Sequence, residues 1–351
     1  MKYFQYFAAK CQQHLVYLMV FLMVFGICIP SRGEVTSNTV PVEILDVFGP
    51  EEESAEDNPN QLTGEESVLA QIKKTGRLTI AIREDSVPFG FRDPATNQWT
   101  GMCIDFAENL KQRLSESLDD QPLIINLYRS NLYNRFSLVR EGVVVLECGP
   151  NTIQHDKQGI TFSNPFLVTG TQILIRNDEL ANFTADPDLS GMRIGVLGRT
   201  TNRIFLEENY PQATLLTFQG SIGRKRGVQA VVQKKINGFA SDGILLFGET
   251  LLLNIAIGSQ YSLYPGYPLN CEEYGLILPD HDPEWREFVN QVISQESTRE
   301  TYQRWIGPLL PALQRVKQYC EQKFTDTEID PERPTQETSE TIEQINLLND
   351  S

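Results

Sequence analysis

Arg77-Leu-Thr-Ile-Ala-Ile-Arg-Glu-Asp-Ser-Val-Pro-Phe-Gly-Phe91 is the strongest fold signal in this chain of 351 residues. Its apolar residues predict a short strand, Leu78–Arg83, which runs into a polar loop that turns at Val87-Pro88-Phe89. Ten residues later, Gly101-Met-Cys-Ile-Asp-Phe106 marks the entry to a helix. Open α/β sheets place such strand-to-helix loops at the edge where they bind ligands. The segment therefore predicts a binding loop at the rim of an α/β sheet.

Strand and helix patterns alternate through the middle of the chain. We expect strands at Leu78–Arg83, Leu123–Leu127, Val143–Glu147, Gln172–Arg176, Arg193–Leu197, Leu215–Phe218, Gly238–Ser241 and Tyr274–Leu278. We expect helices at Ser67–Thr75, Ile104–Leu118, Asn131–Arg140, Thr201–Asn209, Gly223–Lys234, Gly243–Asn254 and Trp285–Trp305. Gly307-Pro308 is expected to end the last helix. This βαβ rhythm predicts an α/β fold with mainly parallel sheets flanked by helices.

The formal charge of −16 is concentrated in the two flanks of the chain. Residues 34–66 and 321–351 are acidic, contain scattered proline and show no sustained hydrophobic period, which predicts a disordered linker and a disordered tail. The middle of the chain is nearly neutral and has no basic stripe. Nucleic acid is therefore not an expected partner.

Residues 1–33 have the pattern of a secretory signal. Two lysines precede an apolar run of fifteen residues, Leu15–Ile29, and small residues follow at Ser31 and Gly33. The run is short for a membrane span, which needs roughly 20 residues. We therefore expect a cleaved signal and a periplasmic protein. The alternative is an uncleaved N-terminal anchor, which would be the chain's one contact with the membrane.

Catalytic and metal-binding motifs are absent from the sequence. His155 and His281, the two histidines outside the N-terminal segment, lie in polar loops without a recognisable nucleophile. No GxxxxGK[ST], HExxH or dinucleotide-binding glycine pattern occurs. No metal and no cofactor is expected.

Several segments in order resemble bacterial extracellular solute-binding protein family 3, the periplasmic polar amino acid-binding components of ABC transporters. The matching segments are Gly101–Phe106, Asn134–Gly142, Gly149–Ile153, Ile160–Phe166, Ile194–Thr201 and Phe239–Asp242. Each motif is weak alone, and their order makes the set specific. The resemblance implies a two-lobe, type II periplasmic-binding-protein-like fold with a two-stranded hinge. Lobe 1 would comprise residues 67–172 and 265–320, and lobe 2 residues 173–264.

The resemblance also implies ligand-binding roles. Asp242 would take the α-ammonium of an amino acid, and the alternative is a plain helix cap. Thr200 and Thr201, at the start of a helix, would bind its carboxylate, with an ordinary threonine cap as the alternative. Asn151 and Thr152 match polar residues that accompany the ligand in the family.

Other contact positions depart from the family pattern. The arginine that usually grips the ligand carboxylate is missing, and Lys157 or Arg199 is the candidate substitute. Ser86 and Met102 stand where the family places aromatic walls. Arg83 replaces an acid found in several relatives, which suits an acidic or neutral ligand, although a solvated surface arginine is the alternative.

Four cysteines remain after the N-terminal segment: Cys103, Cys148, Cys271 and Cys320. An exported protein could join them as two disulfides in three possible ways. Because the resemblance puts Cys103 and Cys148 at the ligand rim of lobe 1, we favour Cys103–Cys148 with Cys271–Cys320. Four unpaired, buried cysteines are the alternative.

We expect a solute-binding protein that closes on a small polar solute, with an amino acid as the favoured ligand, and delivers it to the permease of an ABC transporter. One alternative is a dehydratase-like enzyme on the same fold, with Glu147 or Glu84 as its acid. Another is a membrane-tethered sensing or orphan binding module without a transport role.

Overall fold

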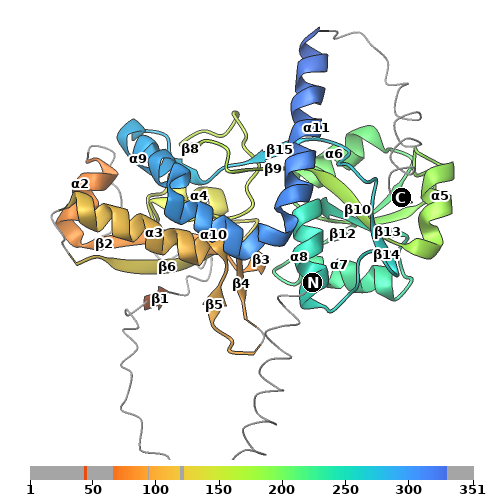
Figure 1. Cartoon of the computed structure of the whole chain (residues 1–351), viewed down its shortest axis with the longest axis horizontal. Coiled ribbons are helices and arrows are strands. Elements are labelled where there is room, and N and C mark those ends of the chain that lie inside the picture. Colours follow the sequence, from red (N-terminus) through yellow and green to blue (C-terminus); the bar gives the residue numbers. More distant parts are fainter. Residues whose placement is uncertain (1–42, 46–65, 94, 119–121, 330–351) are drawn as a thin grey trace, which may run out of the picture. The chain divides into compact units, whose positions relative to one another are not determined.

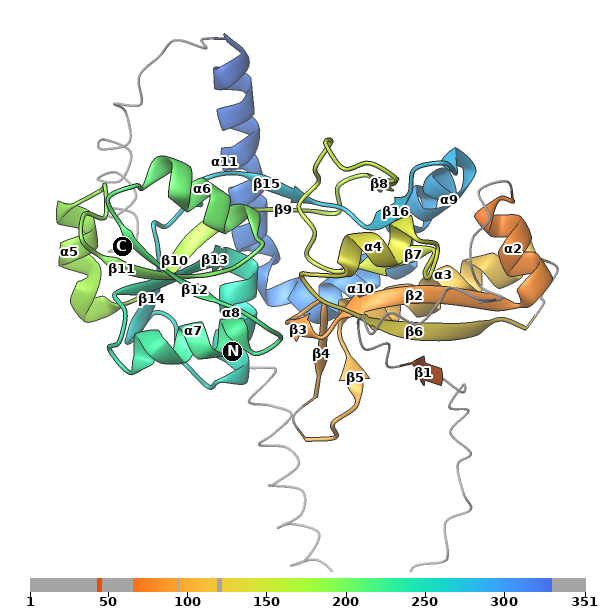
Figure 2. The ribbon, with the colours of Figure 1, turned by 180° about the vertical axis from the view of Figure 1, so that it is seen from behind.

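The computed structural model describes residues 43–45, 66–93, 95–118 and 122–329 (Figures 1 and 2). These residues form two sheets flanked by helices and joined by a short pair of strands. None of the helices among the described residues combines the length and apolar character needed to cross a membrane. The predicted signal, residues 1–33, lies outside the described residues.

The first sheet has the strand order β1-β6-β2-β7-β16-β8. Its strands are β1 (Glu43–Leu45), β2 (Arg77–Arg83), β6 (Ile124–Ser130), β7 (Leu146–Cys148), β8 (Ile160–Phe162) and β16 (Ile277–Pro279). The strands β6, β2 and β7 are parallel, and β16 pairs antiparallel with β7 and β8. From Leu78 on, β2 is buried along its whole length, as expected for a central strand covered on both faces.

Helices and a small hairpin sheet surround this first sheet. The helices are α2 (Val68–Thr75), α3 (Met102–Ser117), α4 (Arg135–Arg140), α9 (Pro283–Ser294) and α10 (Glu296–Ile306). The rim loop after β2 forms three short antiparallel strands, β3 (Asp85–Ser86), β4 (Gly90–Arg92) and β5 (Trp99–Thr100). The rim loop is therefore ordered by its own backbone pairing.

The second sheet has the strand order β12-β11-β13-β10-β14. Its strands are β10 (Thr171–Arg176), β11 (Arg193–Leu197), β12 (Thr214–Phe218), β13 (Gly238–Asp242) and β14 (Tyr261–Tyr264). The surrounding helices are η1 (Asn177–Glu179), α5 (Leu180–Ala185), α6 (Thr201–Asn209), α7 (Gly223–Val232) and α8 (Gly243–Leu252). The strands β12, β11 and β13 are parallel, and β10 pairs antiparallel with both β13 and β14. Each sheet therefore combines parallel strands with one strand that is antiparallel to both of its neighbours.

Two antiparallel strands, β9 (Leu167–Thr169) and β15 (Glu272–Tyr274), connect the lobes (Figure 2). The chain enters the second sheet at Thr171, two residues before the predicted boundary of lobe 2, and leaves that sheet after Tyr264. A connection made of two adjacent strands permits hinge bending between the lobes.

The predicted final strand and final helix are each divided in the structure. The expected strand Tyr274–Leu278 is split because β15 pairs with the hinge strand β9, whereas β16 joins the first sheet. The expected helix Trp285–Trp305 breaks at Gln295, which is extended with ψ 158°. The Thr298 hydroxyl donates to the carbonyl of Val292 at 2.7 Å, which satisfies a group freed by this break.

The prediction of a disordered tail over residues 321–351 is wrong for residues 321–329, which are helical. A short turn, η2 (Gly307–Leu309), leads into α11 (Leu310–Ile329), so Gly307-Pro308 does not end the helical region. Proline is tolerated in the first turn of a helix, where its missing N–H has no intrahelical partner. Residues 330–351 and most of the predicted linker, residues 34–66, lie outside the described residues.

The four cysteines form the two favoured disulfides. Cys103–Cys148 joins the start of α3 to the end of β7, and Cys271–Cys320 joins the segment before β15 to α11. The stacked rings of Tyr267 and Tyr319, with centroids 4.8 Å apart, lie near the second bridge in sequence. The helix α11 is therefore attached to the hinge region covalently and by packing.

Candidate functional site

A small polar pocket of about 20 Å³, open in part to solvent, lies between residues of both lobes. This volume leaves room for roughly one water molecule, so the lining side chains of the two lobes lie close together. Its polar lining residues are Arg83, Arg135, Thr152, Thr200, Thr201, Asn202, Arg224 and Asp242. The first three belong to lobe 1 and the others to lobe 2. We refer to this group of residues as the polar pocket.

Asp242 ends strand β13 and directs its carboxylate to side chains instead of its own helix. It precedes α8 but makes no side-chain cap bond, so the plain helix-cap interpretation is wrong. One carboxylate oxygen accepts from the Asn202 amide at 2.9 Å, and the other accepts from the Tyr274 hydroxyl. Burial raises the pKa of Asp242, and burial together with this carboxylate raises the pKa of Tyr274 well above its usual value. Asp242 is thus held at the sheet edge by two donors.

Glu272, from hinge strand β15, accepts hydrogen bonds from two of the predicted ligand-binding threonines, one in each lobe. The Thr201 hydroxyl donates to its Oε2 at 2.9 Å, and the Thr152 hydroxyl donates to the same oxygen. The Asn270 amide donates to Oε1 at 3.1 Å. Burial, followed by the nearby Asp242 charge, raises the pKa of Glu272 to about 7. Thr200 instead acts as the N-cap of α6 and accepts from the Arg203 amide, as the ordinary-cap alternative expects.

Arg83, at the end of β2, is a pocket residue and not a solvated surface charge. Its side chain is 1% exposed and forms two hydrogen bonds to the Asp85 carboxylate, at 2.8 and 3.0 Å. Burial alone would raise the pKa of Asp85, but Arg83, the Arg224 charge and a hydrogen bond from Ser86 together hold this pKa below its usual value. Part of the positive charge of Arg83 is therefore balanced within lobe 1.

Two further arginines, Arg135 and Arg224, enter the pocket from helix N-termini. Arg135 opens α4 and donates to the Asn151 side-chain oxygen at 3.2 Å. Arg224 lies in the first turn of α7 and donates to the backbone carbonyl of Asp85, across the two lobes. Both are more than 90% buried, and the Nε group of each has no partner among the described residues. Burial, then the neighbouring Arg83 charge, lowers the pKa of Arg135 to about 10, so it stays charged at neutral pH.

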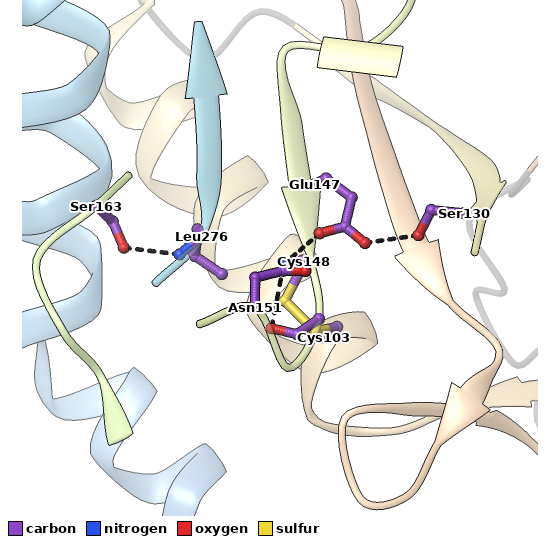
Figure 3. The surroundings of a disulfide bond; sticks show 8 residues. Cys103, Ser130, Glu147, Cys148, Asn151, Ser163 and Leu276 are labelled. Carbon is purple, nitrogen blue, oxygen red and sulfur yellow. Dashed lines mark hydrogen bonds between the residues drawn. A yellow bond between two sulfur atoms is a disulfide. The ribbon is translucent and has the colours of Figure 1, made fainter. Parts of the chain in front are cut away.

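Asn151 does not line the polar pocket but hydrogen-bonds to two buried side chains next to it, Arg135 and Glu147. Its amide donates to the Glu147 carboxylate, and Ser130 donates to the other oxygen of Glu147 at 2.6 Å (Figure 3). Burial raises the pKa of Glu147. Glu147 is fully buried beside the Cys103–Cys148 disulfide and does not line the polar pocket. Asn151 therefore connects Glu147 to Arg135.

Besides Asn151, four predicted contact residues lie outside the lining of the polar pocket. Met102 lines a separate apolar cavity between α3 and α10, and Ser86 is buried and donates to Asp85 at 3.1 Å. Lys157 pairs with the adjacent Asp156 at 3.0 Å. Arg199 is exposed and lies 4.3 Å from the ring centre of Tyr133. None of the four reaches the pocket lining in this structure.

Sequence analysis missed Arg135, Arg224, Glu272 and Tyr274 as site residues. Arg135 is part of the Asn134-Arg135 motif, which contributed to the family resemblance but was not assigned a part in ligand binding. Arg224 stands in the basic run Gly223-Arg-Lys-Arg226, in which Lys225 and Arg226 are exposed. Glu272 is adjacent to Cys271, and nothing in its local pattern marks a ligand site.

Comparison with known proteins points in the same direction as this geometry. The chain is 26% identical over 243 residues to the glutamate/aspartate import solute-binding protein of Salmonella typhimurium, covering 68% of this chain and 78% of that protein. It is 23% identical to the L-glutamate/L-aspartate-binding protein of Pseudomonas aeruginosa, covering 72% of this chain and 83% of that protein. Cyclohexadienyl dehydratase of the same organism is 25% identical, covering 70% and 88%.

Solved structures show the fold. An ancestral amino acid-binding protein, described as a precursor of cyclohexadienyl dehydratase, matches with a TM-score of 0.57 and 21% identity, covering 68% of this chain and 99% of that one. A histidine-bound substrate-binding protein of an ABC uptake transporter from Streptococcus pneumoniae matches with a TM-score of 0.57 and 14% identity, covering 68% and 95%. These neighbours confirm the predicted two-lobe, type II binding-protein fold. The family model for bacterial extracellular solute-binding proteins, family 3, matches residues 78–308. The chain belongs to this family.

Proposed function

We propose that this protein captures an acidic amino acid outside the cytoplasm and delivers it to an ABC-type importer. The observation that carries the proposal is the charge of the polar pocket. Three buried arginines, Arg83, Arg135 and Arg224, line it together with a single carboxylate, that of Asp242. Buried cations with unpartnered donors are costly unless an anion completes them, so the pocket favours a ligand with excess negative charge.

The zwitterionic part of such a ligand has suitable partners. Asp242 offers a carboxylate to the α-ammonium, a charge-assisted bond that strengthens as closure excludes water. The arginine donors and the N-terminal end of α6, with Thr201 in its first turn, suit two carboxylates. The names of the Salmonella and Pseudomonas relatives, which refer to glutamate and aspartate, support this ligand class.

A location outside the cytoplasm agrees with the presence of two disulfides. Two disulfides persist in oxidising compartments and are rare in the cytosol. We propose that residues 1–33 direct export. If this segment is retained after export, it would anchor the protein to the membrane; if it is cleaved, the protein would be free in the periplasm.

Isothermal titration calorimetry at pH 7 tests the ligand class. L-Glutamate or L-aspartate should bind, while L-arginine should not, because a cationic side chain would face three arginines. Arg224→Gln should weaken binding roughly 30-fold, about 2 kcal/mol, since it removes a buried charge partner. Arg226→Gln, on the exposed side of the same helix, is the matched control and should bind normally. Tight binding of arginine, or unchanged affinity in Arg224→Gln, would overturn the proposal.

We further propose that the protein does not catalyse a reaction, although one relative is a dehydratase. The two acids first considered for such chemistry are both occupied. Glu147 is buried behind the pocket, and Glu84 pairs with Arg92 and Arg129. Incubation with a prephenate-like cyclohexadienyl acid, followed by ultraviolet absorbance, should show no turnover. Sustained turnover that depends on Glu147 or Glu272 would refute this assignment.

A further inference from the structure

Among the residues that the structure describes, Glu272 is the one carboxylate that contacts both sides of the polar pocket from the hinge. Its oxygen Oε2 accepts from Thr152 of lobe 1 and from Thr201 of lobe 2. Both hydroxyls line the pocket, although the Glu272 side chain itself does not. The protein's own carboxylate therefore occupies the donors that a ligand carboxylate would use.

A hydroxyl has one proton and can donate one full hydrogen bond at a time. If a ligand carboxylate approaches Thr152 and Thr201, it competes with Glu272 for these two protons. The competition places two carboxylates at shared donors, with a third, Asp242, close by. Like charges in a buried site do not all remain ionised, and the usual outcome is that one carboxylate binds a proton.

The surroundings identify Glu272 as the group that would change. The groups that face it are Thr152, Thr201, Asn270, Asp242, Tyr274 and, opposite it on β9, Thr169. Its three hydrogen-bond donors are neutral. Asp242, by contrast, interacts with the charges of Arg224 and Arg135. On α11, Lys323 is directed to the backbone carbonyl of Leu269 at 3.5 Å. Among the acids around the pocket in the described residues, Glu272 thus has the weakest support from neighbouring cations.

We propose that Glu272 is a specificity-determining residue that takes up one proton when a carboxylate-bearing ligand binds. The proton comes from solvent and converts Glu272 into an O–H donor. Thr152 and Thr201 are then free to donate to the ligand carboxylate. Capture of an acidic amino acid is in this way linked to pH, and the inference rests on the ligand class proposed above.

Proton uptake can be measured directly on the full-length protein. L-Glutamate and L-aspartate are titrated by calorimetry in two buffers of different ionisation enthalpy, at pH 5, 6, 7 and 8. A free-state pKa of about 7 predicts close to no proton taken up at pH 5 and close to one per ligand at pH 8. The same linkage predicts affinity roughly tenfold weaker at pH 8 than at pH 6.

Two variants separate this role from a structural one. Glu272→Gln should bind with no proton uptake and with an affinity independent of pH from 6 to 8. Glu273→Gln, at the exposed neighbouring position, should retain the wild-type uptake. Circular dichroism on both variants checks that they are folded, and the wild-type measurement stands even if Glu272→Gln does not fold.

The outcomes distinguish this inference from the proposed function. Binding of glutamate or aspartate without proton uptake would overturn the role of Glu272 and leave the ligand class intact. Uptake that persists in Glu272→Gln would also overturn it. If neither amino acid binds at any of the four pH values, both the ligand class and this inference are wrong.

Discussion

The ligand-free protein should lose stability as pH rises through neutrality, and Glu272 should account for a defined part of that loss. Burial and the Asp242 charge raise the pKa of Glu272 from its ordinary 4.5 to about 7 in the folded state. The unfolded chain releases this proton near pH 4.5, whereas the folded chain keeps it until about pH 7. Between these values the folded state binds more protons, so the free energy of unfolding decreases with increasing pH.

The size of the effect follows from the difference between the two pKa values. Each pKa unit corresponds to about 1.4 kcal/mol, so a rise from 4.5 to about 7 corresponds to about 3 kcal/mol. This contribution is fully present below pH 4.5 and is lost by about pH 8. Glu272→Gln carries no titrating group at this position and should lack this component.

Urea unfolding followed by circular dichroism, at intervals from pH 4.5 to pH 8, measures the effect. Other buried acids, including Asp242 and Glu147, also titrate, so the informative quantity is the difference between wild type and Glu272→Gln at each pH. This difference should change by about 3 kcal/mol in favour of the variant as pH rises. The exposed variant Glu273→Gln should follow the wild type. Parallel profiles for wild type and Glu272→Gln would refute the reasoning.

Two further substitutions test lobe closure and the attachment of α11. In Gly248→Ala, the new Cβ would lie 2.2 Å from the carbonyl oxygen of Val87 in lobe 1, so calorimetry should show weaker ligand binding, while the free protein gains up to about 1 kcal/mol of helix stability. Gly266→Ala, which meets nothing within 4 Å, is the control, and equal ligand affinities for both variants would contradict the closure argument. Replacing both Cys271 and Cys320 by serine removes a bridge with a sequence separation of 49 residues and should lower the free energy of unfolding by about 4 kcal/mol. Urea midpoints that do not change in the double variant would contradict that value.

Local sequence patterns predicted the site residues whose positions are set by a few consecutive residues of the chain. The strand, rim loop and helix around Arg83 were readable because hydrophobic periodicity and turn residues act over a few positions. The same holds for Asp242 at a strand end and for Thr200 and Thr201 at a helix start. Each of these four residues lines the polar pocket.

Hydrogen bonds between residues that are distant in sequence could not be predicted from local patterns. Glu272 meets Thr152 across 120 residues and Thr201 across 71, and no local pattern encodes either contact. At the break in the last predicted helix, the Val292 carbonyl accepts from the Gln295 amide and from the Thr298 hydroxyl, six residues later. A helical pattern that continues in sequence gives no sign of such a break.

The cations of the site illustrate the same difference. Lys157 and Arg199 lie near the family motifs in sequence, but their side chains pair with Asp156 and pack on Tyr133. Arg135 and Arg224 reach the pocket because the folds of α4 and α7 aim the first turn of each helix at it. The direction of each helix, which depends on tertiary packing, therefore determines which cationic side chains line the polar pocket.

Among the three arginines, Arg224 should contribute most to recognition of an acidic ligand. Arg83 is neutralised by Asp85, and Arg135 is connected to Glu147 through Asn151. Within the described residues Arg224 has no carboxylate at salt-bridge distance, and its guanidinium donates to the backbone carbonyl of Asp85 in the opposite lobe. A ligand carboxylate that neutralises Arg224 acts on a residue that already joins the two lobes. Charge recognition and closure would then depend on the same side chain, because Arg224 reaches lobe 1 only when the lobes are together.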